Sequence, residues 1–192
     1  MRMKNVAIFA SGDGTNAENV IAELEKSDLA RVTLVVTNNR NAGVIQRAEK
    51  CHVDSAVIDS KGQNAQEILE ILKVNEIDII LLLGYLRLFP LEVIEAYKGH
   101  IANLHPALLP KYGGKGMYGH FVHEAVSASG DRLSGFTLQR SAPRYDEGEI
   151  LYQEEVQLPA GVTSEECERL VRALEHEKVA PAIRELIESG VI

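Results

Sequence analysis

Short apolar runs alternate with segments of helical periodicity over the first half of the chain. An apolar run that ends in glycine or polar residues is typical of a strand buried on both faces. Strands are predicted at 6–10, 32–36, 56–58 and 77–83, and in a segment that ends at 103. Between them, helical spacing of apolar residues predicts helices after 16, over about 42–50, from 65 onward and over about 91–97. This alternation predicts crossover connections in a parallel sheet covered by helices on both faces.

The second half of the chain has a different pattern. A helix is predicted over 120–128, followed by strands over 133–139 and 150–156 that a polar turn connects. Strands on so short a connection pair in the antiparallel sense. Thr163 and Glu166 form a capping box that opens a last helix. We therefore predict one domain over residues 1–192: a Rossmann-like, doubly wound α/β sheet, mostly parallel, with an antiparallel C-terminal pair of strands and a closing helix.

Composition narrows the classes of partner. The formal net charge of −8 argues against a surface for nucleic acid or anionic membrane, although a local pocket for a small phosphate remains compatible with it. Cys51 and Cys167 lie far apart and match no zinc or redox spacing. His120 and His123 have no third ligand near them in sequence, so we predict no metal site. The N-terminal apolar run is too short for a signal peptide or a membrane span, so we expect a cytoplasmic protein.

Three polar loops follow predicted strands, at 12–16, 85–87 and 103–105. Ligands of open parallel sheets bind outside the carboxyl ends of the strands, where such loops meet. The sequence therefore predicts that these loops line one pocket.

Asn103 and His105 lie two residues apart at the end of a strand, and Pro106 follows them. In an extended chain such residues point to the same side. An amide donor beside a titratable imidazole suits the stabilisation of an oxyanion in acyl transfer. A strand end whose polar side chains only satisfy a turn is the commoner alternative. The convergence of three loops favours the functional interpretation.

The segment 12–17 reads Gly-Asp-Gly-Thr-Asn-Ala and fits the glycine-rich turn that brings backbone N–H groups to an anion at a helix start. A dinucleotide site also needs an acidic residue after the second strand, and Thr37, Asn38 and Asn39 stand there instead. We therefore favour a monophosphate over NAD. A tight turn without a ligand is the alternative.

Asp146 lies in the polar turn between the two C-terminal strands. A carboxylate within about 4–6 Å of an imidazole raises its pKa and keeps it protonated, so Asp146 is a candidate partner for His105. A solvated turn residue is the alternative. Arg87 could pair with a phosphate or a carboxylate, or extend from an apolar loop into solvent.

Taken together, these motifs resemble the folate-dependent formyltransferase family. The resemblance rests on Ser-Gly-Asp-Gly-Thr-Asn at 11–16, Leu-Gly-Tyr-Leu-Arg-Leu at 83–88, Asn-Leu-His-Pro-Ala-Leu-Leu-Pro at 103–110 and Asp-Glu-Gly at 146–148. The glycine loop and the chain length are most similar to the branch that formylates glycinamide ribonucleotide. The hydrolase branch, which deformylates the same folate, usually has an extra N-terminal regulatory domain and is the less expected alternative.

The resemblance implies transfer of a formyl group from 10-formyltetrahydrofolate to the amine of glycinamide ribonucleotide, in de novo purine (IMP) biosynthesis and without a metal. It implies that His105 is general acid and oxyanion stabiliser and Asn103 the second oxyanion donor. It also implies that Asp146 keeps His105 in its working state and shuttles the amine proton through water. The two small molecules are the expected partners, with a homodimer left open.

Further binding residues are implied only by the family motifs. The ribonucleotide phosphate is assigned to Gly14, Thr15 and Asn16, and the amine side of that substrate to Glu175. The folate is assigned to Lys61, Leu86, Arg87, Leu88, Phe89 and Asn103. Lys61 stands where the family usually has arginine, and lysine binds as a point charge rather than as a fork.

One segment departs from the family pattern. The family usually reads Thr-Val-His where this chain reads Thr137-Leu138-Gln139, and glutamine does not titrate as histidine does. A proline and two arginines follow within 140–144. The 115–119 loop is also slightly longer than usual. These changes leave the folate affinity open and keep a non-catalytic ligand-binding protein as an alternative.

Overall fold

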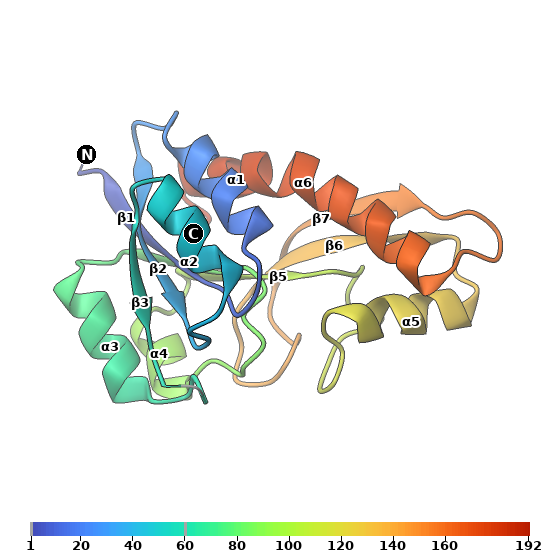
Figure 1. The fold of residues 1–192 in the computed structure, drawn as a ribbon, viewed down its shortest axis with the longest axis horizontal. Helices are drawn as coiled ribbons and strands as arrows, with labels where there is room; N and C mark the ends of the chain where they lie inside the picture. The colour runs from blue at the N-terminus through green and yellow to red at the C-terminus, as the bar shows by residue number, and fades with distance from the viewer. Residues whose placement is uncertain (1, 60) are drawn as a thin grey trace.

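A seven-stranded sheet runs through the centre of the molecule in the order β3-β2-β1-β4-β5-β6-β7 (Figure 1). The computed structural model describes residues 2–59 and 61–192. The strands are β1 (Lys4–Phe9), β2 (Ala30–Thr37), β3 (Asp54–Val57), β4 (Ile79–Leu82), β5 (Ile101–His105), β6 (Leu133–Arg140) and β7 (Ile150–Gln157). The helices are α1 (Thr15–Leu24), α2 (Gly43–Lys50), α3 (Ala65–Val74), α4 (Leu91–Ala96), α5 (His120–Ser129) and α6 (Ser164–Glu188).

Strand pairing confirms the predicted fold class. All pairs among β1, β2, β3, β4 and β5 are parallel, whereas β5 with β6 and β6 with β7 are antiparallel. The antiparallel pairing of β5 with β6 places Gln139 opposite Asn103 and Thr137 opposite His105. This register brings the departure at Gln139 beside the predicted catalytic strand end.

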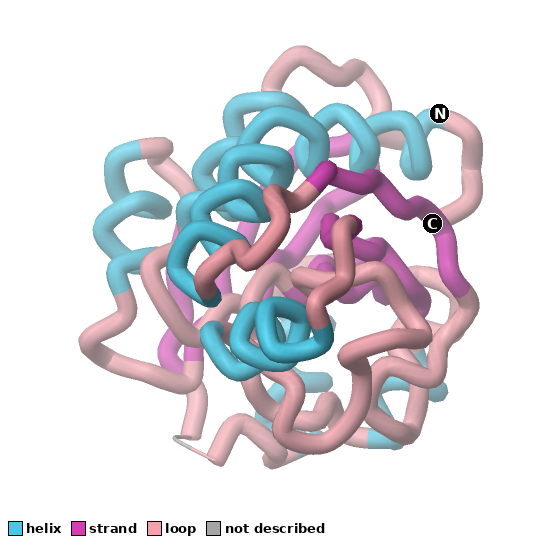
Figure 2. The backbone as a smooth tube through the Cα atoms, turned by 90° about the vertical axis from the view of Figure 1, so that its right-hand side faces the viewer, coloured by secondary structure: helices cyan, strands magenta, loops and turns pink. Residues whose placement is uncertain are grey.

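Helices cover both faces of the sheet. Alternate residues of β1 point to opposite faces, so that Val6 and Ile8 join one buried cluster while Ala7 and Phe9 join the other. The first cluster includes residues of α1, α2 and α6, and the second includes residues of α3 and α4. Figure 2, seen from the side of α5, shows helices above and below the strands. Burial on both faces explains why these strands are nearly continuous apolar runs.

Local signals in the sequence set the starts of two helices. The Asn64 side chain accepts a hydrogen bond from the backbone N–H of Glu67 at 3.2 Å, and Thr163 does the same for Glu166 at 3.2 Å. The Thr163 cap was predicted from the sequence as part of a capping box. Helix α6 continues through Pro181 and packs against α1 and α5. It thereby closes the sheet face on which α1 lies.

The strand order has a switch point between β1 and β4. The chain leaves β1 toward β2 on one side, whereas it continues from β4 to β5 on the other side. The loops that leave β1 and β4 therefore diverge and open a crevice at the carboxyl edge of the sheet. None of the helices in the described part of the chain is long and apolar enough to cross a membrane.

Candidate active site

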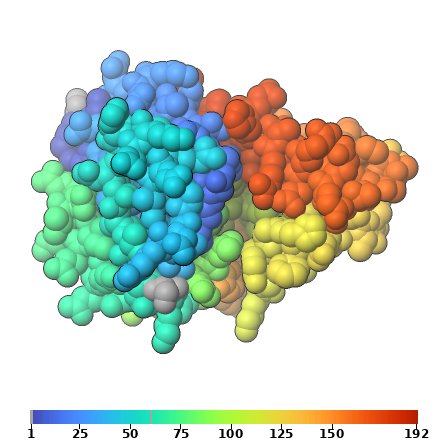
Figure 3. All heavy atoms as spheres, viewed as in Figure 1, coloured from blue at the N-terminus to red at the C-terminus, as the bar shows by residue number. Residues whose placement is uncertain are grey.

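A cavity of about 980 Å³ lies at the carboxyl edge of the sheet, and residues of all three predicted loops line it. Figure 3 shows the surface hollowed between the N-terminal half and the yellow segment around α5. The volume is at the upper end of the range of about 300–1,000 Å³ typical of small-molecule sites. The structure thus brings the three loops together as predicted.

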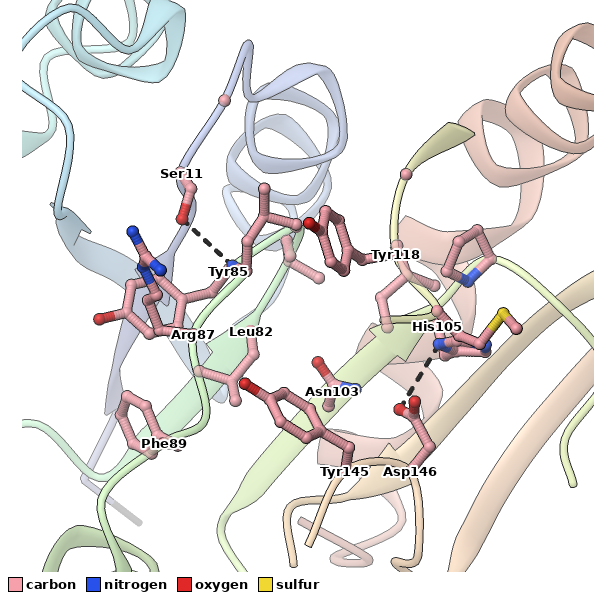
Figure 4. A pocket seen from close by; sticks show the side chains of 18 of the residues that line it. Ser11, Leu82, Tyr85, Arg87, Phe89, Asn103, His105, Tyr118, Tyr145 and Asp146 are labelled. Carbon is pink, nitrogen blue, oxygen red and sulfur yellow. Dashed lines mark hydrogen bonds and ion pairs between the residues drawn. The ribbon is translucent and has the colours of Figure 1, made fainter. Parts of the chain in front are cut away.

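Strand β5 presents Asn103 and His105 to this cavity (Figure 4). His105 is buried, and its Nε2 lies 2.8 Å from the carbonyl oxygen of Tyr112. Because a carbonyl only accepts hydrogen bonds, Nε2 must carry a proton, and Nδ1 is left facing Asp146. The Asn103 side chain makes no hydrogen bond to the described residues, so its amide is free to donate to a ligand.

Two hydrogen-bond donors and the His105 imidazole surround the Asp146 carboxylate. Its Oδ2 accepts from the backbone N–H of Gly114 at 2.8 Å, and its Oδ1 accepts from Nε2 of Gln139 at 2.8 Å. The same Oδ1 lies 3.4 Å from His105 Nδ1. Asp146 has a φ of 58°, a left-handed conformation that aspartate tolerates better than most residues. The turn therefore aims a buried carboxylate at the imidazole, as the sequence predicted.

The net direction of the pKa shift at His105 is opposite to the effect expected from Asp146 alone. Burial lowers the pKa of His105, and the opposing influence of Asp146 and the Tyr112 carbonyl does not offset it. Asp146 raises this pKa in the expected direction, but burial has the larger effect. A neutral His105 carries its proton on Nε2 and offers Nδ1 as an acceptor.

The glycine turn before α1 forms the second part of the cavity. Gly14 has a φ of 79°, and a Cβ there would lie 2.8 Å from Cα of Val44. Only glycine therefore allows this close packing of the turn against α2. Gly14, Thr15 and Asn16 line the cavity at the start of α1, where the first backbone N–H groups of a helix lack intrahelical partners. This geometry suits an anion.

Glu175 of α6 is brought to the same loop. Its Oε2 accepts a hydrogen bond from Nδ2 of Asn16 at 3.0 Å. Burial raises the pKa of Glu175, and the lowering influence of Asn16 and Arg172 is smaller. The sequence assigned Glu175 only by family resemblance, and the structure places it in the cavity lining.

Residues of the loop after β4 line another side of the cavity: Leu86, Arg87, Leu88 and Phe89. The Phe89 ring packs edge-to-face against Phe9 and Tyr85, at centroid distances of 5.0 and 5.9 Å. The backbone N–H of Leu86 donates to Oγ of Ser11 at 3.2 Å, which ties this loop to the glycine turn (Figure 4).

Lys61 is exposed and lies outside the set of described residues that line the cavity. Its neighbour Gly62 accepts a hydrogen bond from the Tyr85 hydroxyl at 2.6 Å. The loop that carries Lys61 is therefore anchored near the cavity, while the lysine itself is not in it.

The arginines of the departing segment are engaged in ion pairs. Arg140 pairs with Glu149 at 2.7 Å, and its guanidinium also donates to the carbonyl of Val191 at 2.9 Å. Arg144 is exposed and pairs with Glu147 at 3.0 Å. Both residues line the cavity, but their positive charges are already balanced by carboxylates.

Several residues of the site were missed by sequence reasoning. Tyr112 and Gly114 hold the two catalytic candidates through backbone atoms, which leave no mark in side-chain patterns. His123 lines the cavity from α5, and burial lowers its pKa to about 4. Its Nδ1 lies 3.8 Å from Sγ of Cys167. The sequence signal that could have identified His123 as a cavity residue is its position on the inward face of the predicted helix.

Among residues 2–59 and 61–192, no three His, Cys, Asp or Glu side chains are arranged so that they could hold a metal ion.

Comparisons with known proteins agree with the geometry. Residues 4–183 match the family model described as Formyl transferase. The chain is 37% identical to "Phosphoribosylglycinamide formyltransferase, chloroplastic" of Vigna unguiculata, over 100% of this chain and 64% of that protein. It thus spans about two thirds of the length of that relative. It is 32% identical to the Bacillus subtilis phosphoribosylglycinamide formyltransferase, over 96% of this chain and 95% of that protein.

A solved structure has the same fold over nearly the whole chain. Glycinamide ribonucleotide transformylase 1 from Geobacillus kaustophilus superposes with a TM-score of 0.87 at 33% identity. The match covers 97% of this chain and 100% of that one.

Proposed function

This chain belongs to the formyl transferase family, and we propose that it transfers a formyl group from 10-formyltetrahydrofolate to the amine of glycinamide ribonucleotide. The observation that carries this proposal is the grouping of Asn103, His105 and Asp146 beside an anion-binding helix start in one cavity. We further propose that residues 1–192 act as one domain and that the reaction serves purine biosynthesis in the cytoplasm.

The ribonucleotide binds with its phosphate at the backbone N–H groups of Gly14, Thr15 and Asn16. The helix start supplies both unpaired donors and the positive end of the helix dipole. Glu175, hydrogen-bonded to Asn16, then faces the amine side of this substrate. Burial raises the pKa of the Glu175 carboxyl, and its carbonyl oxygen can accept a hydrogen bond from the amine in the neutral form that attacks.

The folate lies along the loop that contains Leu86, Arg87, Leu88 and Phe89, with its formyl group toward Asn103. This loop offers apolar side chains beside the catalytic strand end. Lys61 reaches the folate tail only from the rim, since it lies outside the cavity lining.

The reaction forms one carbon–nitrogen bond and breaks another. The amine nitrogen attacks the formyl carbon, and the carbonyl oxygen becomes an oxyanion next to the free amide of Asn103. The attacking nitrogen gives up a proton, which Asp146 passes through water to the free Nδ1 of His105. The imidazolium then donates to the oxyanion, and its proton finally goes to the folate nitrogen that leaves.

The Tyr112 carbonyl and the Asp146 carboxylate have distinct roles in this sequence. The carbonyl holds the proton on Nε2, so that only Nδ1 takes part in proton transfer. The carboxylate stabilises the positive imidazole once it forms, because Asp146 raises the pKa of His105 against the effect of burial.

A spectroscopic formyl-transfer assay tests the proposal. We expect purified protein to deformylate 10-formyltetrahydrofolate only when glycinamide ribonucleotide is present, with one formylated product per folate consumed. Brisk release of formate without the ribonucleotide would make the protein a hydrolase instead. Binding of both ligands without turnover would make it a non-catalytic binding protein.

A further inference from the structure

Gln139 occupies a buried position next to two of the catalytic candidates, Asn103 and Asp146. The residue is only 2% exposed, and it lines the cavity from β6. In the antiparallel pairing it stands directly opposite Asn103. Cross-strand partners of this kind have their side chains on the same face of the sheet. The amide of Gln139 therefore lies beside the oxyanion donor and the carboxylate.

The orientation of this amide is set by Asp146. Nε2 of Gln139 donates to Oδ1 of Asp146 at 2.8 Å, whereas Oε1 of Gln139 is buried without a hydrogen-bond partner among the described residues. A buried oxygen without a partner is costly, but turning the amide would give up the bond from Nε2 and place Oε1 against the carboxylate oxygen. An ionised carboxylate accepts but does not donate, so it holds the amide in this orientation.

The same carboxylate oxygen faces His105. Oδ1 of Asp146 is bonded by Gln139 and lies 3.4 Å from Nδ1 of His105. The remaining oxygen, Oδ2, is held by the backbone N–H of Gly114. Without Gln139, one fixed donor would remain, and the carboxylate could turn about that bond.

We propose that Gln139 is a positioning residue, whose amide holds Asp146 against His105 by a hydrogen bond that does not titrate. This inference rests on the proposed function. Because the glutamine amide stays neutral, the donor of this bond does not change with pH. Gln139 acts through Asp146 and does not need to touch either substrate.

Gln139→Met tests the role with little change of volume. We expect kcat to fall about 10- to 100-fold, which is typical for the loss of a partner that orients an active-site ligand. The KM values for both substrates should stay within about threefold, because the phosphate loop and the folate loop are untouched. A kcat within about twofold of wild type, or a loss confined to KM, would overturn the proposal.

A conservative variant and a matched control sharpen the result. Gln139→His restores a donor to Asp146, so kcat should recover above that of Gln139→Met, with an added ionisation in its pH profile. If the histidine variant is no better than the methionine variant, the hydrogen bond is not what matters. Gln153→Met is the control, since the Gln153 amide bonds the Leu109 carbonyl and the Thr137 hydroxyl instead. It should leave kcat unchanged.

A readout without substrate separates this inference from the proposed function. NMR titration of the His105 imidazole reports how closely Asp146 is held, because Asp146 raises the pKa of His105. In Gln139→Met that pKa should fall further, whereas in Gln153→Met it should not move. A rise would show that Gln139 competes with His105 for Asp146, and no change would show that it is a structural amide only. If the pKa falls but wild type transfers no formyl group, only the proposed function fails.

Discussion

Asp146→Asn removes one charge from the site with almost no change of shape. The variant's amide oxygen can still accept from the backbone N–H of Gly114. Its NH₂ group would face Nε2 of Gln139, but Gln139 can turn its amide and offer the unpartnered Oε1 as an acceptor. Asparagine also tolerates the left-handed φ of this position. We therefore expect the variant to fold normally, so that any loss of activity reports the charge.

The separation of the two groups sets the size of the effect. At the 3.4 Å between His105 Nδ1 and Asp146 Oδ1, two unit charges interact by about 5 kcal/mol at an effective dielectric constant of about 20. That energy corresponds to a rate factor of about 10³–10⁴. Only part of this electrostatic energy lowers the barrier, because the imidazole is positively charged only while it holds the transferred proton. We expect kcat to fall by about 10³-fold, within the range of about 10²–10⁴ for general acid–base catalysis.

The measurement is the ribonucleotide-dependent formyl-transfer rate at saturating substrates. Asp78→Asn is the control, because Asp78 pairs with Arg2 and accepts from the backbone N–H of Asn5, at the opposite end of β4. It should stay within about twofold of wild type. Matching thermal midpoints would establish that both variants are folded. A kcat for Asp146→Asn within tenfold of wild type would refute the electrostatic role of Asp146.

Three further predictions concern the rest of the cavity. Glu175→Gln keeps an acceptor for Asn16 but removes the carboxylate. The KM for the ribonucleotide should therefore rise about tenfold, while the KM for the folate should not change. Steady-state kinetics with each substrate varied in turn measures both values. Gly14→Ala forces a Cβ to 2.8 Å from Cα of Val44 at a φ of 79°, so calorimetry should show a thermal midpoint several degrees lower. The rise in thermal midpoint that added phosphate gives the wild type should also be lost. An unchanged midpoint would contradict the packing argument. The pKa of His123 is about 4 in the folded protein and about 6.5 when unfolded, so the unfolded state binds the extra proton and stability falls as pH decreases from 6.5 to 4. A shift of one pKa unit corresponds to about 1.36 kcal/mol, and partial access of water reduces the effect. In urea titrations, the free energy of unfolding of wild type should therefore fall by about 2 kcal/mol more over that pH window than that of His123→Leu.

The order and type of the elements could be predicted from the sequence because their signals are local. Apolar runs identified strands that are buried on both faces, and the Thr163 capping box marked the start of the last helix. The carboxyl-edge rule then placed the three loops in one cavity, and the two-residue spacing placed Asn103 and His105 on one side of a strand.

The direction in which the pKa of His105 shifts depends on the tertiary structure. The sequence shows a carboxylate that could raise its pKa, but the net effect depends on how completely the imidazole is removed from water. Burial outweighs Asp146, and burial arises from packing of the whole sheet edge. No local pattern carries that information.

The contacts that position the site were likewise beyond the sequence. Tyr112 and Gly114 act through backbone atoms, and the bond from Gly114 to Asp146 spans 32 residues. Gln139 was seen only as a departure from a motif, whereas the structure places it opposite Asn103 and bonds it to Asp146. The sequence by itself determined the strands, the helix caps and the chemical types at the strand ends. The tertiary structure alone decided which donor bonds to which acceptor and how fully the His105 imidazole is removed from water. The reason is that hydrogen bonds and desolvation depend on atoms that are distant in the chain.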